Sequence, residues 1–155
     1  MSPPGSRPVA RRILAALVVA MASGQLSDLG GFVDIVATYH VGGDTLAAFL
    51  AVALIVGEAA GGVGLLGADH ARRRRATGLV VAVAVGWSLL AAQGFARGLA
   101  LDNCGCFGVH LAQPLRWWVL VEDAELIALA LWVRRQTTHR PPVGARALGE
   151  EVSRP

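Results

Sequence analysis

The feature that most constrains the fold is a series of long apolar segments separated by short polar ones. The clearest spans residues 45–68, which contain a single charged side chain, Glu58. A helix of this length rises about 36 Å, enough to cross a hydrocarbon core of about 30 Å with some tilt. Similar apolar segments occupy residues 13–32, 77–95 and 115–133. The sequence therefore predicts four transmembrane helices.

The composition agrees with a membrane protein. Of the 155 residues, 54% are hydrophobic and only 16% are charged, whereas soluble domains average about 25% charged residues. We expect an all-α membrane protein, an antiparallel bundle of four transmembrane helices with short connections. Residues 13–135 would form this single domain, with residues 1–12 and 136–155 as disordered cytoplasmic ends.

The distribution of arginine predicts the orientation of the helices. All 14 basic residues are arginine. Three precede the first apolar segment, four form the block at residues 72–75, and five follow residue 133, whereas the other two connections hold only Arg97 and Arg116. By the positive-inside rule, both termini are cytoplasmic and the connections at residues 31–44 and 97–116 lie on the outer face of the cell membrane. The basic clusters lack the aromatic interleaving of nucleic-acid sites, so we expect no nucleic-acid partner.

The first apolar segment has a second interpretation. Two arginines, a short apolar stretch and the small-residue sequence Ala20-Met21-Ala22 are also typical of a secretory signal peptide, which would be cleaved near residue 22. Cleavage would leave the orientation of the later segments unchanged.

The two cysteines, Cys104 and Cys106, lie in the outer connection and flank Gly105. A disulfide needs Cα atoms about 4.4–6.8 Å apart, whereas an extended chain places such residues about 6.6–7.2 Å apart. The backbone must therefore bend, which Gly105 permits. A strained disulfide on the oxidising side of the membrane would be easily reduced. We therefore predict a thiol–disulfide exchange site; two unpaired thiols or an inert disulfide are the alternatives.

Glu58 is the third candidate site residue, because an ionisable group near the middle of a membrane helix is costly and often functional. It would accept a proton during thiol chemistry, or alternatively make an interhelical hydrogen bond. In the same segment, Gly57 and Gly61 form a small-residue face suited to close helix contact. Three acids of the last segment, Glu122, Asp123 and Glu125, would lie at the membrane interface, or alternatively line a wet cleft under the cysteines.

These features together resemble the MauE family, methylamine-utilisation membrane proteins related to DoxX. The resemblance covers about residues 13–135. It rests on four apolar segments, the pattern Gly24…Asp28…Phe32, the sequence Glu58-Ala59-Ala60-Gly61, and Cys104-Gly105-Cys106-Phe107-Gly108 before the last segment. DoxX-like sequences often have a lysine near the end of the first segment, where this chain has Gln25 and Ser27.

The resemblance implies a role in the redox maturation of an exported partner, by disulfide formation or electron transfer. In the methylamine system that partner is the disulfide-rich small subunit of methylamine dehydrogenase, and DoxX relatives are linked to quinone-dependent sulfur oxidation. The chain would be thiol–disulfide oxidoreductase-like if it is an enzyme. With one cysteine pair it would need an external partner, a quinone in the bilayer or a thioredoxin-like protein outside.

Charged neighbours would tune the two thiols. Arg97, Arg116 and His110 would lower a thiol pKa if they lie close to it, and Asp102 would raise it. Two alternative functions stay open. Cys104, Cys106, His110 and His40 would supply four metal ligands, or the protein would be a non-catalytic scaffold for assembly of a partner enzyme.

Overall fold

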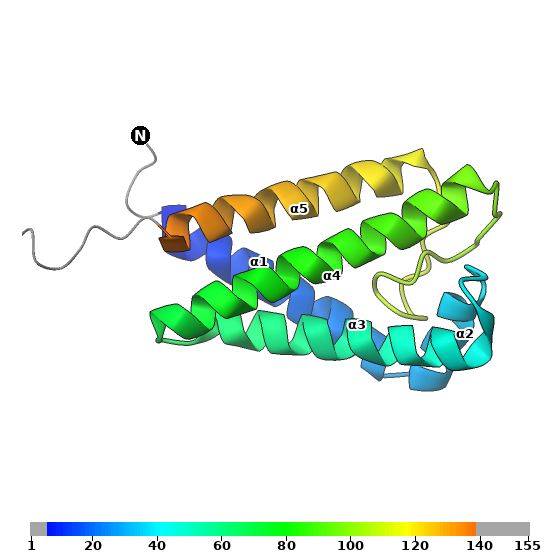
Figure 1. Cartoon of the computed structure of the whole chain (residues 1–155), viewed down its shortest axis with the longest axis horizontal. Coiled ribbons are helices and arrows are strands. Elements are labelled where there is room, and N and C mark those ends of the chain that lie inside the picture. Colours follow the sequence, from blue (N-terminus) through cyan, green and yellow to red (C-terminus); the bar gives the residue numbers. More distant parts are fainter. Residues whose placement is uncertain (1–5, 139–155) are drawn as a thin grey trace, which may run out of the picture.

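The computed structural model describes residues 6–138 of the chain, so residues 1–5 and 139–155 of the predicted disordered ends lie outside the described residues. The described part has five helices: α1 (Ser6–Leu26), α2 (Leu29–Ala37), α3 (Gly43–Leu66), α4 (His70–Ala96) and α5 (Trp117–Thr138) (Figure 1). Three of them are long and apolar enough to cross a membrane, namely α1 from Pro8, α3 and α4. The protein is therefore an all-α, multi-pass membrane protein.

Helix α5 does not meet the same criterion of length and apolar composition. Its 22 residues include three acids in the first half and two arginines near the end. The fourth membrane crossing, predicted at residues 115–133, therefore stays a prediction.

Helix α3 packs between α1 and α4, and α5 packs against α4 and touches α1. Glycine allows these close contacts: a Cβ atom at Gly61 would lie 2.6 Å from Val80 Cγ2 of α4, and one at Gly62 would lie 2.6 Å from Val19 Cγ2 of α1. Gly57 likewise faces Val83 of α4. The small-residue face predicted from Gly57 and Gly61 is thus a close helix contact, and Gly62 provides a second one on the other side of α3.

The connection between the first two long helices differs from the prediction. The first apolar segment was expected to reach residue 32 and to be followed by a polar connection. Instead, α1 spans Ser6–Leu26, and residues 29–37 form a separate helix, α2. Asp28 starts this helix, because its Oδ1 accepts a 2.9 Å hydrogen bond from the backbone N–H of Gly31. Phe32 and Val36 of α2 are buried, so this segment belongs to the core.

The arginine block at residues 72–75 was expected in a loop but lies in the first turns of α4. Asp69 caps this helix by accepting backbone hydrogen bonds from Ala71 and Arg72. The start of α1, the α3–α4 connection and the end of α5 lie at one end of the molecule, whereas α2 lies toward the other end (Figure 1). The arginine-rich segments are therefore gathered at a single end.

Candidate functional site

The cysteine segment of the loop at residues 97–116 folds back among the helices. In Figure 1 the loop turns from the end of α4 toward the middle of the molecule. Cys104 is only 2% exposed. A Cβ atom at Gly105 would lie 3.0 Å from Ile35 Cγ2 and 3.3 Å from Trp87 Cη2. The cysteine segment is thus enclosed by α2 and α4, which is tolerated in a membrane protein when irregular backbone is buried in protein.

Asn103 and two glycines shape the cysteine segment itself. The side chain of Asn103 accepts a 2.9 Å hydrogen bond from the N–H of Gly105 and donates one of 2.9 Å to the carbonyl of Gly108. Gly105 and Gly108 have φ values of +89° and +73°, a region that other residues rarely adopt. The bend expected at Gly105 is therefore present, and Asn103 stabilises it.

Side chains of α1 and of the turn that follows α2 anchor both cysteine carbonyls. The Tyr39 hydroxyl donates a 2.8 Å hydrogen bond to the Cys104 carbonyl, and Gln25 Nε2 donates one of 3.0 Å to the Cys106 carbonyl. Burial, followed by the nearby Cys104, raises the pKa of Tyr39, so its hydroxyl stays protonated and can donate. Gly24 of α1 lies directly against the Phe107 carbonyl, where any side chain would collide. The segment is therefore fixed from α1 and from the end of α2.

The two cysteines are free thiols with their Sγ atoms 3.4 Å apart. The hydrogen bond between the two thiols lowers the pKa of Cys104 to about 7. The same hydrogen bond, together with burial and the negative charge on Cys104, raises the pKa of Cys106 well above its ordinary value. The pair thus titrates as a unit that holds one shared proton over a wide pH range, and one sulfur is available as a thiolate near neutral pH.

The side chains expected to shift the pKa values of the two thiols are not the main causes of those shifts. Arg97 Nη1 donates to the carbonyls of Tyr39 and His40, both at 3.3 Å, and the Arg116 guanidinium lies over the Trp118 ring, 5.4 Å from its centroid. In the described part of the chain, the charges that raise the pKa of Cys104 are those of Asp123 and Glu122 of α5. His110 and Asp102 are not among the groups that shift the pKa of either thiol.

Glu58 is fully buried beside this site. Its Oε1 accepts a 2.7 Å hydrogen bond from Trp87 Nε1, while Oε2 has no hydrogen-bond partner among the described residues. The Gln25 amide lies next to the same carboxyl group, and Glu58 also acts electrostatically on Cys106. Glu58 therefore makes the interhelical hydrogen bond of one interpretation, and its role as a proton acceptor stays a prediction.

A cavity of about 360 Å³ opens beside Cys106, between α1, α5 and the loop. We call it the α1–α5 groove; Leu17, Met21, Cys106, Phe107, Gln113, Glu122, Asp123, Glu125, Leu126 and Leu129 line it. Asp123 is only 6% exposed and its Oδ2 has no partner among the described residues. The three acids of α5 line a cleft beside Cys106, as in the second of the two interpretations, and their depth in the membrane stays a prediction.

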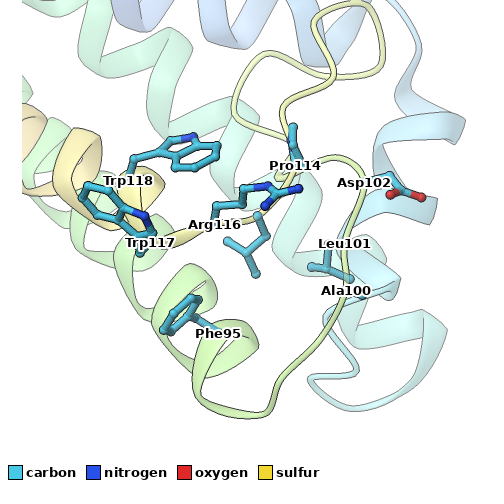
Figure 2. Close-up of a pocket in the computed structure, with 9 residues that line it drawn as sticks. Phe95, Ala100, Leu101, Asp102, Pro114, Arg116, Trp117 and Trp118 are labelled. Atoms are coloured by element: carbon cyan, nitrogen blue, oxygen red, sulfur yellow. The ribbon is translucent and has the colours of Figure 1, made fainter.

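A second cavity, of about 460 Å³, lies on the other side of the loop, between the end of α4 and the start of α5 (Figure 2). Phe95, Trp117 and Trp118 line one side of it and Leu101 the other, with Arg116 between them (Figure 2). Trp117 is 63% exposed. Neither cysteine lines this cavity, whereas Cys106 lines the α1–α5 groove.

The structure does not assemble the proposed metal ligands Cys104, Cys106, His110 and His40. Within residues 6–138, no group of three or more His, Cys, Asp or Glu side chains is arranged to hold a metal ion. The three residues predicted for catalysis, in contrast, lie in one neighbourhood. Sequence reasoning did not identify Tyr39 and Trp87 as their neighbours, and it placed Asp123 under the cysteines only as an alternative. The feature of the sequence that could have identified these neighbours is that each is a polar or aromatic side chain inside or beside an apolar segment.

Comparisons with known proteins identify the family of the chain. The family model described as methylamine utilisation protein MauE matches residues 7–134. A curated protein, methylamine utilization protein MauE of Paracoccus denitrificans, is 35% identical over 125 residues, which cover 78% of this chain and 64% of that protein. The chain thus spans slightly less than two thirds of the length of this relative. No solved structure gives a significant match. Because the family model covers most of its length, the chain belongs to the MauE family.

Proposed function

We propose that this protein carries out thiol–disulfide exchange in the membrane and thereby matures an exported protein of methylamine utilisation. The observation that supports this most directly is the Cys104–Cys106 pair, with Sγ atoms 3.4 Å apart in a segment fixed by hydrogen bonds from Gln25 and Tyr39. A purely structural segment would not need one thiol with a pKa of about 7. The family name supports the link to methylamine.

The membrane arrangement is part of the proposal. The four long helices cross the bilayer as an antiparallel bundle, with residues 13–135 as one domain. Both termini face the cytoplasm and the cysteine loop faces outward. The gathering of the arginine-rich segments at one end of the molecule supports this orientation. Outside the cytosol, the reactant for the thiol pair is an exported protein such as methylamine dehydrogenase, whose disulfides form there.

The proposed chemistry uses three residues of the chain. A thiolate of the pair forms a mixed disulfide with the partner, and the second cysteine resolves it. Glu58, with its free Oε2, accepts or returns a proton. Because the chain has only two cysteines, electrons must enter or leave through another molecule, a quinone in the bilayer or a thioredoxin-like protein outside.

A mixed-disulfide trap tests the proposed function. Cells grown on methylamine express the Cys104→Ser or the Cys106→Ser variant, and rapid acid quenching followed by alkylation preserves mixed disulfides. We expect one of the variants to hold an exported protein in a complex that a reductant releases. The double serine variant is the control and should hold nothing. Growth on methylamine that is unaffected by both serines, with no complex captured, would contradict the proposal and favour a non-catalytic assembly scaffold.

A further inference from the structure

The two thiols differ in their access to solvent and to other molecules. Cys104 is 2% exposed, and its carbonyl and amide are held by Tyr39 and Gln113. Cys106 is partly exposed and lines the α1–α5 groove, which Cys104 does not. A reactant that enters the groove therefore meets Cys106 first.

The groove also has a distinct charge. Three carboxylates line it, those of Glu122, Asp123 and Glu125, and its lining includes no arginine or histidine of the described chain. Glu122 is held in place, because its Oε2 accepts a 2.7 Å hydrogen bond from Gln113 Nε2 of the loop. Asp123 has one carboxylate oxygen without a partner. Grouped charges of one sign in a cleft attract the opposite charge and repel their own.

We propose that Cys106 is the cysteine that exchanges with the external reactant, that Cys104 is the resolving cysteine, and that the α1–α5 groove admits neutral or cationic thiols and disulfides in preference to anionic ones. This inference rests on the proposed function, and it assigns the roles of the two sulfurs and the charge class of the reactant.

The exchange balances as follows when the reduced pair meets a disulfide. Near neutral pH the pair holds one shared proton. When this proton lies on Cys104, the Cys106 thiolate attacks one sulfur of the reactant, a Cys106–reactant disulfide forms, and the other reactant sulfur leaves as a thiolate that takes the proton from Cys104. The Cys104 thiolate then attacks the Cys106 sulfur, which forms the Cys104–Cys106 disulfide and releases the second reactant thiolate. Two electrons pass to the reactant; one of its sulfurs keeps the proton that the pair shared, and the other takes a proton from solvent. Oxidation of a reactant dithiol follows the same steps in reverse, again through Cys106.

Charged methanethiosulfonate reagents test both parts of the proposal on the full chain purified in detergent. These reagents transfer a thio group to a thiolate and release methanesulfinate. With the neutral methyl reagent, we expect the Cys104→Ser variant, which keeps Cys106, to react at least about tenfold faster than the Cys106→Ser variant. After denaturation the two variants should react alike. Equal rates in the folded protein, or faster reaction of Cys104, would overturn the assignment of roles.

The charge preference is measured on the Cys104→Ser variant. The measured quantity is the rate of the cationic trimethylammonioethyl reagent divided by the rate of the anionic sulfonatoethyl reagent. We expect this ratio to be roughly tenfold higher in the folded protein than in a denatured sample. A second substitution in this variant, Asp123→Asn, should reduce the preference for the cationic reagent. Glu125→Gln, at an exposed position that tolerates substitution more readily, should reduce it as well. No preference, or a preference for the anion, would overturn the second part.

The labelling experiment and the mixed-disulfide trap can fail independently of each other. If the labelling follows these expectations but no exported protein is captured in cells, the proposed function fails and the assignment of Cys106 stands. If a partner is captured only through Cys104, the proposed function stands and this inference fails.

Discussion

The indole N–H of Trp87 on α4 donates a 2.7 Å hydrogen bond to the buried carboxyl group of Glu58 on α3. The same indole lies at the inner edge of the cysteine segment, close to Gly105, and its ring is tilted against Phe32 of α2 with centroids 6.1 Å apart. One aromatic side chain thus connects the carboxyl group, two helices and the thiol loop. This arrangement makes the structural and chemical contributions of Glu58 separable by mutation.

Glu58→Gln should preserve the fold, because the amide oxygen still accepts the Trp87 N–H. Glu58→Leu should lower the free energy of unfolding by about 1–3 kcal/mol, since it leaves a buried donor without a partner. Unfolding of the detergent-solubilised protein, followed by tryptophan fluorescence, measures both. If Glu58 transfers protons, Glu58→Gln should also slow the oxidation and reduction of the thiol pair. Full exchange activity in a normally folded Glu58→Gln protein would leave this residue only its structural role.

Gly105→Ala should destabilise the cysteine segment for two reasons. Its φ value of +89° disfavours any side chain, and the new Cβ would lie 3.0 Å from Ile35 Cγ2. Together we expect a loss of about 1–3 kcal/mol in the free energy of unfolding and slower closure of the Cys104–Cys106 disulfide. Gly98→Ala is the matched control, because Gly98 has a φ of +66° but its Cβ would meet nothing within 4 Å. Equal effects of the two substitutions would show that contact with α2 and α4 is unimportant.

Much of the architecture followed from the sequence, because apolar length is a local property. The segments at residues 45–68 and 77–95 correspond to most of α3 and α4. Helix α2 was missed because its first residues were assigned to the end of the first apolar segment, and the rest to a polar connection at residues 31–44 that contains Asp34, His40 and Asp44. Asp28 was the available signal, since aspartate commonly caps a helix.

The candidate site was predictable only in part. The spacing of Cys104 and Cys106 and the isolated charge of Glu58 identified the reactive residues. The depth of the loop depends instead on contacts between distant segments, such as Gly24 with Phe107 and Tyr39 with Cys104. No local pattern encodes which helix side chain meets a loop about 65 residues or more away. The sequence identified the acids of α5 as candidate residues of a cleft, but only the packing of α5 against the loop shows that they line the same groove as Cys106.

Gly24→Ala should displace the cysteine segment, because the new Cβ would collide with the Phe107 carbonyl. Backbone atoms cannot yield as a flexible side chain can, so the loop or α1 must shift. We expect faster alkylation of Cys104 in a Cys106→Ser background, together with a lower midpoint of thermal unfolding. Gly78→Ala, in α4, is the control: its Cβ would meet nothing within 4 Å, and alanine favours helices more than glycine does, by about 1 kcal/mol. Unchanged labelling in Gly24→Ala would contradict the close contact between α1 and the loop.

The thiol pair should ionise in two well-separated steps, which the ultraviolet absorbance of the thiolate reports without any need for reagent access. After subtraction of the double serine variant, the first thiolate should appear with a midpoint near the Cys104 pKa of about 7, and the second far above the ordinary thiol range. Cys106→Ala removes the donor that stabilises the Cys104 thiolate, so the pKa of Cys104 should rise to its ordinary value of about 8.5 or beyond.

The same two pKa shifts determine how the stability of the folded protein changes with pH. Because folding lowers the pKa of Cys104, its ionisation stabilises the protein fully above the unfolded pKa of about 8.5, and this contribution is lost as the pH falls through about 7. The raised pKa of Cys106 acts in the opposite direction at higher pH. Stability should therefore rise between about pH 7 and 8.5 in the wild type and lose this rise in Cys106→Ala. A single midpoint at the ordinary thiol pKa, unchanged in Cys106→Ala, would show that the two sulfurs do not share a proton.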